Sequence, residues 1–287
     1  MQKGKSKKKV RPYAKQKSQP GLEFKMDPKP EFERRKLKLK LFNKTAIITG
    51  GDSGIGRAVA IAFSKEGCNV GIIYYNEHKD ARQTKQEIEN EGRKCILIPG
   101  DITDEKFCKK AVDKIYKEFG RLDILVNNAA VQFPQESITD ITGKQLHKTF
   151  ETNIFSYFYM IKASMKYLDK GSVIINTTSV TAYRGSGGLI DYSSTKGAIV
   201  TLTRSLSASL INKKIRVNAV APGPVWTPLI PASFDAKKVS EFGTDSPMGR
   251  AGQPEEIAPC YVFLASEDSS FMTGQVLHPN GGEIING

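Results

Sequence analysis

Beyond residue 40, short apolar runs alternate along the chain with longer stretches in which apolar residues recur every three or four positions. The first run, residues 45–49, is apolar or β-branched throughout and predicts a buried strand. The stretch after it predicts a helix that ends at Gly67, because its apolar residues share one helical face. That face comprises Ile55, Val59, Ala62 and Phe63. Together the two segments form one βα unit.

The same alternation continues toward the C-terminus. Further strands are predicted at residues 69–74, 95–98, 124–126, 173–176 and 215–220. Helices are predicted around 81–91, over 107–119 and from near Tyr192. Strands separated by helices pair in parallel through right-handed crossovers. We therefore expect an α/β fold, a doubly wound parallel sheet of the Rossmann type, as one domain over residues 41–287, with ligands at the carboxyl ends of its strands.

Composition narrows the class of protein. The 287 residues are 39% hydrophobic, which is enough for one large core. The four cysteines lack the spacing of a disulfide framework or a metal site; they are Cys68, Cys95, Cys108 and Cys260. No run approaches the roughly 20 apolar residues that span a bilayer. We expect a soluble cytoplasmic protein with no membrane segment and no bound metal.

The net charge of +13 is concentrated at the N-terminus. Residues 1–40 hold 15 Lys or Arg and 4 Asp or Glu, so the remaining chain carries a net charge of only +2. This basic, Pro- and Gln-containing segment predicts an extended arm, either solvated or lying along a neighbouring subunit through its apolar residues. Those residues are Leu22, Phe24, Met26 and Phe32. Nucleic-acid binding is disfavoured, because the arm has no aromatic platform and the body is nearly neutral.

A glycine-rich segment, TGGDSGIG at 49–56, joins the first predicted strand to the first helix. Backbone N–H groups at a helix N-terminus can bind a pyrophosphate, and glycine lets the backbone approach it closely. Ordinary tight turns also use glycine. The position between strand and helix favours a dinucleotide site. Its expected residues are Gly50, Asp52, Ser53, Gly54, Ile55 and Gly56.

The end of the second strand bears on the choice between NAD and NADP. After Tyr75, which we place in the cofactor site, come Asn76, Glu77 and His78. The usual ribose-binding acidic residue and an obvious cation for a 2′-phosphate are both missing from this position. The lack of an obvious cation favours NAD, although Arg57 or a lysine from another segment could bind the 2′-phosphate of NADP. The choice therefore stays open between NAD and NADP.

Three motifs together resemble the short-chain dehydrogenase/reductase family: TGGDSGIG, then GDI at 100–102, then NNAA at 127–130. The resemblance implies that Asp101 and Ile102 contact adenine, and that Asn128 and Ala129 support the cofactor ribose. Ala130 departs from the family's glycine, a change expected to narrow the turn. The segment APGPVWT at 221–227 is similar to the family's turn at the nicotinamide carboxamide. The resemblance places Pro222, Gly223, Val225 and Thr227 there.

The family's four active-site residues also have counterparts in matching contexts. They are Asn153 in ETN, Ser179 in NTTSV, and Tyr192 with Lys196 in YSSTK. The resemblance implies hydride transfer between NAD(P) and a small carbonyl or alcohol substrate, with proton exchange by Tyr192. A phenol with a pKa of about 10 is a poor base at neutral pH, so it needs a nearby cation.

Lys196 lies one helical turn from Tyr192 and can supply that charge. The family also assigns this lysine to the nicotinamide ribose. Ser179 would donate a hydrogen bond to the substrate oxygen. By resemblance Asn153 retains a water molecule. Each residue alone has an ordinary structural explanation, but the ordered set favours catalysis.

Several further expectations depend on the resemblance. Residues 227–248 correspond to a substrate lid, in which specificity resides, residues 249–266 to the family's last helix and residues 274–282 to its last strand. The resemblance also implies a homotetramer. His278, at a predicted strand end, is expected to be structural. A cofactor-binding sensor without turnover is the alternative function, and the intact Tyr192 and Lys196 argue against it. Sugars, sugar alcohols, steroids and simple aldehydes all remain compatible as substrates.

Overall fold

The computed structural model describes residues 15–16, 19–32 and 39–285 of the chain. It divides the chain into two units, residues 1–38 and 39–287. In the first unit, Glu23–Lys25 form a 3-10 turn, η1, and the four apolar side chains of the predicted arm are exposed. The other residues of that arm, including most of its basic ones, lie outside the described residues.

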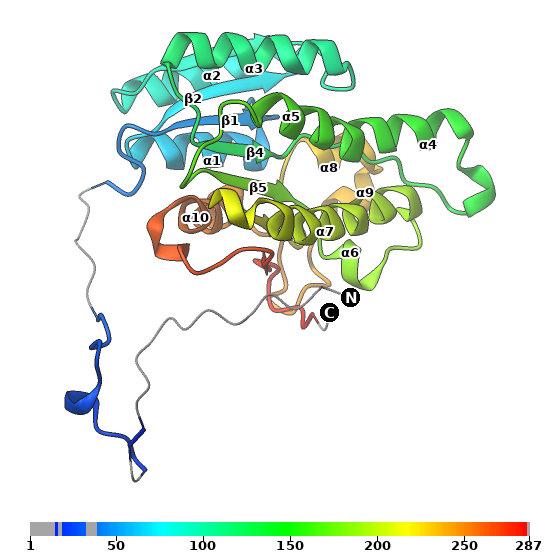
Figure 1. Ribbon diagram of the computed structural model, residues 1–287. Coiled ribbons are helices and arrows are strands. Elements are labelled where there is room, and N and C mark those ends of the chain that lie inside the picture. The colour runs from blue at the N-terminus through cyan, green and yellow to red at the C-terminus, as the bar shows by residue number, and fades with distance from the viewer. Residues whose placement is uncertain (1–14, 17–18, 33–38, 286–287) are drawn as a thin grey trace. The chain divides into compact units, whose positions relative to one another are not determined.

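The second unit is built on a parallel sheet of seven strands in the order β3-β2-β1-β4-β5-β6-β7 (Figure 1). The strands are β1 Thr45–Thr49, β2 Asn69–Tyr74, β3 Cys95–Pro99, β4 Ile124–Asn127, β5 Val173–Thr177, β6 Arg216–Val220 and β7 Val276–Leu277. The order reverses between β1 and β4, which opens a crevice at their carboxyl ends. The predicted doubly wound fold is confirmed.

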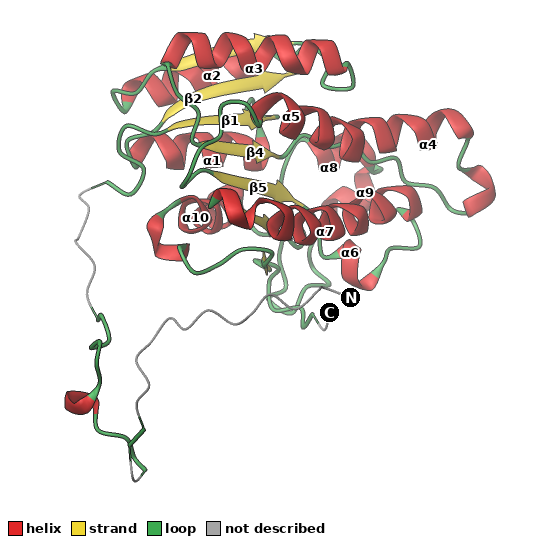
Figure 2. Cartoon of the chain, viewed as in Figure 1, coloured by secondary structure: helices red, strands yellow, loops and turns green. Residues whose placement is uncertain are grey.

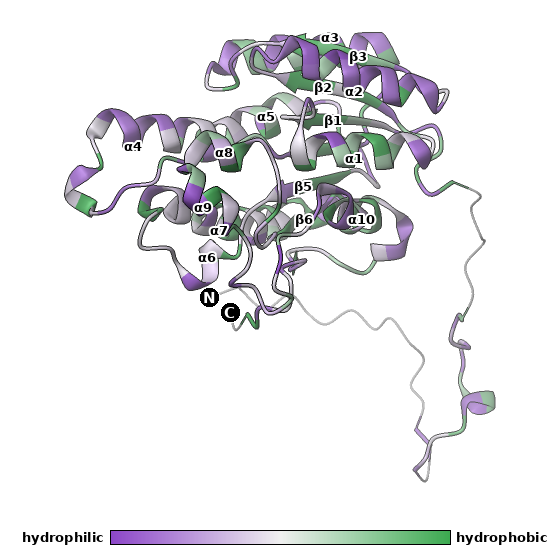
Figure 3. Cartoon of the chain, turned by 180° about the vertical axis from the view of Figure 1, so that it is seen from behind, coloured by the Kyte–Doolittle hydropathy of each residue, from purple (hydrophilic) through white to green (hydrophobic). Residues whose placement is uncertain are grey.

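Helices cover both faces of the sheet (Figure 2). One face carries α1 Gly54–Lys65, α2 His78–Asn90 and α10 Pro254–Ala265, and the other α3 Glu105–Phe119, α5 Ser156–Ser164 and α7 Ile190–Leu210. Neighbouring strand residues point to opposite layers, so that Ala46 and Ile48 join one core and Ile47 the other. Burial on both faces explains why apolar residues predominate in the strands, most of which Figure 3 colours green.

The C-terminal elements differ from the prediction. The last strand is two residues long instead of covering 274–282. Gly274, Gly281 and Gly282 have φ values of +73°, +76° and +100°, which a strand does not accommodate. The last helix starts at Pro254 and not near residue 249, because Gln253 and Glu256 form a capping box at its N-terminus.

Several helical segments were not predicted from the pattern. They are η2 Ile138–Asp140, α4 Gly143–Phe150, the π-helix η3 Glu151–Phe155, α5, α6 Thr181–Arg184, η4 Ile211–Lys213, α8 Leu229–Ser233, α9 Ala236–Ser240 and η5 Glu267–Ser269. Most are too short for an apolar period to emerge. Two of them, α8 and α9, lie in the predicted irregular segment 227–248.

None of the helices in the described part of the chain is long and apolar enough to cross a membrane.

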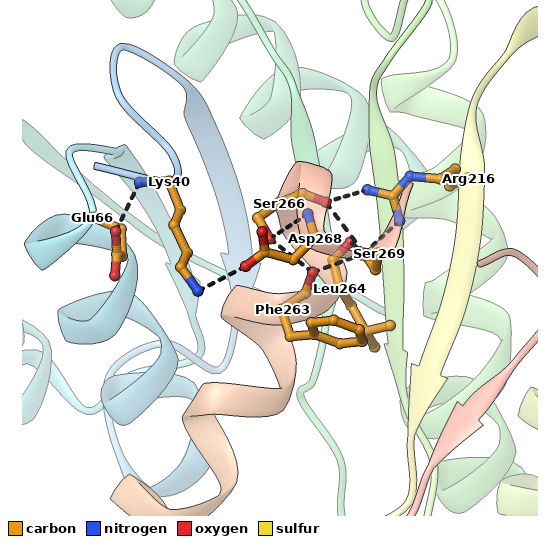
Figure 4. Close-up of polar contacts among 8 residues, drawn as sticks. All are labelled: Lys40, Glu66, Arg216, Phe263, Leu264, Ser266, Asp268 and Ser269. Atoms are coloured by element: carbon orange, nitrogen blue, oxygen red, sulfur yellow. Dashed lines mark hydrogen bonds and ion pairs between the residues drawn. The ribbon is translucent and has the colours of Figure 1, made fainter. Parts of the chain in front are cut away.

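The second unit starts at Leu39, two residues earlier than predicted, and contacts at Lys40 and Leu41 explain why (Figure 4). The Lys40 N–H donates to the Glu66 carboxylate at 2.8 Å, and its ammonium group lies 2.7 Å from Asp268. Leu41 is fully buried, and its N–H donates to the Glu66 carbonyl at 3.0 Å. Arg216 of β6 binds the 3-10 turn η5, which holds Asp268.

We expect Leu41→Ala to lower the free energy of unfolding by about 2–5 kcal/mol, because it removes a fully buried side chain and leaves a cavity. Phe42→Ala is the matched control, since Phe42 is 59% exposed and its loss should cost about 0.5 kcal/mol. Chemical denaturation of the full chain measures both. Equal losses for the two variants would show that Leu41 is not part of the core.

Candidate active site

A cleft of about 1160 Å³ lies at the carboxyl ends of the strands, where Figure 1 shows α8 and α9 beyond the strand ends. It brings together all the site residues predicted from sequence except Gly56 and Asn153. These lining residues are Gly50, Asp52, Ser53, Gly54, Ile55, Tyr75, Asp101, Ile102, Asn128, Ala129, Ser179, Tyr192, Lys196, Pro222, Gly223, Val225 and Thr227.

The glycine-rich turn fits a pyrophosphate. Gly50 and Gly54 have φ values of +64° and +51°, and α1 begins directly at Gly54. Ser53, at the N-cap of α1, makes no side-chain hydrogen bond to the first turn. The backbone N–H groups of that turn are therefore available for an anion. Gly56 lies behind the cleft, where a Cβ atom would stand 1.9 Å from the Gly50 carbonyl oxygen. A side chain at Gly56 would therefore displace the turn.

The end of β2 carries an excess of carboxylates. Burial raises the pKa of Asp52, and the nearby charges of Glu77 and Asp80 raise it further. Arg57 is already bound within the protein, with its Nε donating to the Asp52 carbonyl at 2.9 Å and its Nη2 lying 3.3 Å from Asp80. A cation that sequence reasoning did not name, Lys148 of α4, also lines the cleft.

The turn after β4 is held against the glycine-rich turn. The Thr49 hydroxyl accepts hydrogen bonds from the Asn128 and Ala129 N–H groups at 2.9 and 3.1 Å. The Asn128 amide donates to the Gly50 carbonyl at 3.3 Å. In the described part of the chain, the non-glycine residues with a positive φ are Asn43 and Lys214, so Ala130 has an ordinary negative φ. The conformation thus does not require the family's glycine at this turn.

The turn after β6 closes the other side of the cleft. A Cβ atom on Gly223 would lie 2.7 Å from the backbone of Asn280, so this position needs a glycine. Val225 bridges to Gly252, and the Thr227 side chain would lie 3.1 Å from a Cβ atom on Gly54. The predicted nicotinamide turn is therefore packed against the start of α1.

Tyr192 and Lys196 lie one turn apart on α7, and the Lys196 Nζ is 5.3 Å from the centre of the Tyr192 ring. Lys196 is 1% exposed, and its ammonium group donates to the Thr177 carbonyl at 3.0 Å. Burial lowers the pKa of Lys196 to about 7. Burial raises the pKa of Tyr192 to about 12, and a hydrogen bond with Ser179 opposes part of that rise. At neutral pH the phenol therefore carries its proton.

Asn153 lies in the π-helix η3, behind the cleft lining. Its side-chain amide accepts from the Val131 N–H and donates to the Val131 carbonyl, both at 2.8 Å. It also donates to the Thr195 hydroxyl at 3.2 Å. The side chain thus links the segment after β4 to the helix that carries Tyr192.

Asp191 was missed by sequence reasoning, although it directly precedes Tyr192. It is 2% exposed, and its carboxylate accepts from the Tyr192 N–H at 2.8 Å, the Thr149 hydroxyl at 2.7 Å and the Gln145 amide at 3.1 Å. A buried carboxylate with three donors fixes the first turn of α7 against α4. An aspartate at a helix start is the signal that could have indicated it.

The outer end of the cleft is formed by the predicted lid together with polar residues that sequence reasoning did not single out. From the lid come Leu229, Ile230, Phe234, Lys238, Glu241 and Asp245, and from elsewhere Gln132, Thr181, Arg184 and Glu283. His278 does not line the cleft; its ring packs against Tyr183 at 4.8 Å, and burial lowers its pKa.

The described residues contain no group of three or more His, Cys, Asp or Glu side chains placed to hold a metal ion.

Comparison with known protein sequences places this cleft in a family context. Residues 50–283 match the family model described as enoyl-(acyl carrier protein) reductase. The chain is 62% identical to the uncharacterized oxidoreductase YhxC of Bacillus subtilis, with 98% of this chain and 99% of that protein covered. It is 51% identical to glucose and ribitol dehydrogenase of Daucus carota, with 96% and 98% covered. It is 50% identical to the chloroplastic NADPH-dependent aldehyde reductase 1 of Arabidopsis thaliana, with 95% and 98% covered.

Solved structures agree with the sequence comparison. A short-chain dehydrogenase from Burkholderia cenocepacia in complex with NADP is 30% identical, with a TM-score of 0.79 and 85% of this chain and 98% of that chain covered. One from Mycobacterium paratuberculosis bound to NAD is 28% identical, with a TM-score of 0.78 and the same coverage. The matched motifs, the sheet order and these likenesses show that the chain belongs to the short-chain dehydrogenase/reductase family.

Proposed function

We propose that this oxidoreductase transfers a hydride between NAD(P) and a small carbonyl or alcohol substrate, with Tyr192 as the general acid and base. The observation that carries the proposal is the juxtaposition of Tyr192 and Lys196 in the cleft. Bound nicotinamide would supply or accept the hydride. Gly50, Gly54 and Ser53 would hold the pyrophosphate, while Asp101, Ile102 and Tyr75 would face the adenosine, and the Pro222–Thr227 turn the carboxamide.

Tyr192 would give its proton to the substrate oxygen during reduction, because its raised pKa keeps the phenol protonated at neutral pH. During oxidation the same group must accept a proton. A phenolate beside the Lys196 ammonium offsets the cost that burial imposes on either charge alone. Ser179 would donate a hydrogen bond to the substrate oxygen, where charge develops. Asn153 would position these residues indirectly, because its hydrogen bonds hold Val131 and Thr195 in place.

We further propose NAD as the preferred cofactor. Burial raises the pKa of Asp52, and the charges of Glu77 and Asp80 add to that rise. The negative field of these carboxylates opposes a phosphate near the end of β2. Arg57 is bound by Asp52, Thr84 and Asp80 and is poorly placed to offset that field. Lys148, whose Nζ lies 5.9 Å from the centre of the Tyr75 ring, supplies a positive charge that partly offsets this negative field.

The names of the relatives support two substrate classes, sugars or polyols and simple aldehydes. We propose a homotetramer, consistent with the exposure of Phe155 and Phe158, which are 43% and 47% exposed at the π-helix and α5. The four cysteines are free thiols, which supports a cytoplasmic location.

Tyr192→Phe tests the proposal directly. We expect kcat to fall by at least about 100-fold, the size of a general acid-base contribution, while the Kd of the cofactor stays within about threefold. Steady-state kinetics and nicotinamide fluorescence titration measure the two quantities. Tyr183→Phe, outside the cleft lining, is the matched control and should keep its activity. A Tyr192→Phe enzyme with the wild-type rate would remove Tyr192 from the mechanism.

Cofactor preference gives a second test. We expect NADP to bind about tenfold more weakly than NAD, a difference of about 1.4 kcal/mol. Asp52→Asn removes a negative charge and should bring the Kd of NADP closer to that of NAD. Lys148→Gln removes a positive charge and should move the two Kd values further apart. Fluorescence titration of the wild type and both variants with both reduced cofactors gives the six affinities needed. Tighter binding of NADP by the wild type would contradict the electrostatic argument.

Positioning by Asp191 gives a third test. In Asp191→Asn an amide donor would face one of three hydrogen-bond donors, so the first turn of α7 should shift. We expect kcat to fall by about 10- to 100-fold, with the cofactor Kd within about threefold, because Asp191 does not line the cleft. Thr149→Ser keeps the hydroxyl donor and should behave as wild type. A parallel loss of cofactor affinity and kcat would indicate general unfolding instead.

A further inference from the structure

Gln132 is a buried polar side chain whose purpose the proposed chemistry does not explain. It is 8% exposed and lines the cleft together with Ser179 and Tyr192. Within residues 15–16, 19–32 and 39–285 its amide makes no hydrogen bond to another residue, and its nitrogen and oxygen are not among the fully buried unpaired atoms, so they face the open cleft. A polar group that the protein leaves unpaired on the wall of a binding cleft is available to recognise a ligand.

The backbone on both sides of Gln132 is fixed by side chains from other elements. Val131 is held through both its N–H and its carbonyl by Asn153, at 2.8 Å each. The Phe133 carbonyl accepts from the Gln145 amide at 3.1 Å. A side chain on a backbone anchored on either side is preorganised for binding, because little conformational freedom remains to be lost.

The same contacts tie Gln132 to the reacting group. Asn153 bonds both Val131, the neighbour of Gln132, and Thr195, which lies between Tyr192 and Lys196 on α7. Gln145 bonds both the Phe133 carbonyl and Asp191, the neighbour of Tyr192. Two separate links therefore fix the segment of Gln132 to the first turns of α7. The segment that carries Gln132 and the helix that carries Tyr192 are thus held in a fixed relation to each other, and both side chains line the same cleft.

The charges that line the cleft leave no net field on a neutral ligand. Arg184 is paired with Glu283 at 2.7 Å, so its guanidinium is already neutralised. The lid contributes Lys238, Glu241 and Asp245, and Lys196 adds the positive charge that the proposed mechanism places beside Tyr192, so these four charges sum to zero. A neutral substrate fits such a lining. Among neutral groups, a hydroxyl both donates and accepts, as the amide of Gln132 does.

We propose that Gln132 is a specificity-determining residue that binds a hydroxyl group on the carbon next to the reacting one. The substrates would then be α-hydroxy carbonyl compounds and the corresponding vicinal diols. This inference rests on the proposed function, since it assigns a substrate class to the same cleft. A site built to pair with a hydroxyl discriminates against an analogue that lacks it, because the amide is then left unpaired.

The test uses pairs of substrates in which a methyl group replaces the hydroxyl: hydroxyacetone with butanone, and glycolaldehyde with propanal. The wild type should show a kcat/KM at least tenfold higher for the hydroxylated member of each pair. Gln132→Met keeps the length of the side chain and removes its polar atoms. We expect it to lower kcat/KM about 10- to 100-fold for the hydroxylated substrates and by less than threefold for butanone and propanal.

Binding without turnover gives a second readout. Propane-1,2-diol added to the enzyme with reduced cofactor should bind at least tenfold more weakly to Gln132→Met than to the wild type, as measured by nicotinamide fluorescence. Gln83→Met, an identical change at an exposed position of α2, is the matched control and should leave every ratio unchanged.

The outcomes separate the two proposals. Turnover with an unchanged preference in Gln132→Met, or an equal loss for both members of each pair, would overturn the assignment of Gln132 and leave the proposed function standing. A wild type that turns over none of the four carbonyl compounds with either cofactor would overturn the proposed function, and the inference with it.

Discussion

Burial of a phenol and an amine on neighbouring turns of one helix is the constraint from which the rest of the site follows. Lys196 is 1% exposed and its pKa falls to about 7, while that of Tyr192 rises to about 12. Either group alone resists charging, because water no longer stabilises the ion. Only as a pair can phenolate and ammonium offset that cost. The proposed proton transfer therefore depends on a geometry that the rest of the protein must hold fixed.

The fold supplies that rigidity from both ends of the pair. The Lys196 ammonium group donates to the Thr177 carbonyl at the end of β5, and the Thr178 hydroxyl donates to the Lys196 carbonyl at 2.7 Å. At the other end, Asp191 fixes the first turn of α7 to α4. β5 lies next to β4 in the sheet, so these bonds fix the position of α7 relative to β4, which borders the cleft. Sheet order and side-chain geometry are thus parts of one arrangement.

Local patterns made part of this predictable from sequence. Strands buried on both faces consist mostly of apolar residues, and the glycines of residues 50–56 and the four-residue spacing of Tyr192 and Lys196 are short-range signals. Contacts between distant residues were not predictable in this way. Asp191 meets partners 42 and 46 residues away, and the π-helix around Asn153 is defined by its bonds to Val131 and Thr195. Gln132 has no sequence signature, because its lack of a partner is itself a tertiary property.

Chemistry and specificity are separated in the cleft for a physical reason. The start of the outer segment is fixed by the Val225–Gly252 bridge and by close packing of Thr227 on Gly54. Beyond it, α8 and α9 are five residues each and carry few buried side chains, so their replacement costs the core little. Relatives that are 51% and 50% identical to this chain accordingly bear the names of different substrates. The residues proposed to transfer the proton cannot identify the substrate, because each carbonyl or alcohol presents them with the same oxygen atom. The proposed role of Gln132, whose amide lies outside that chemistry, supplies the missing discrimination.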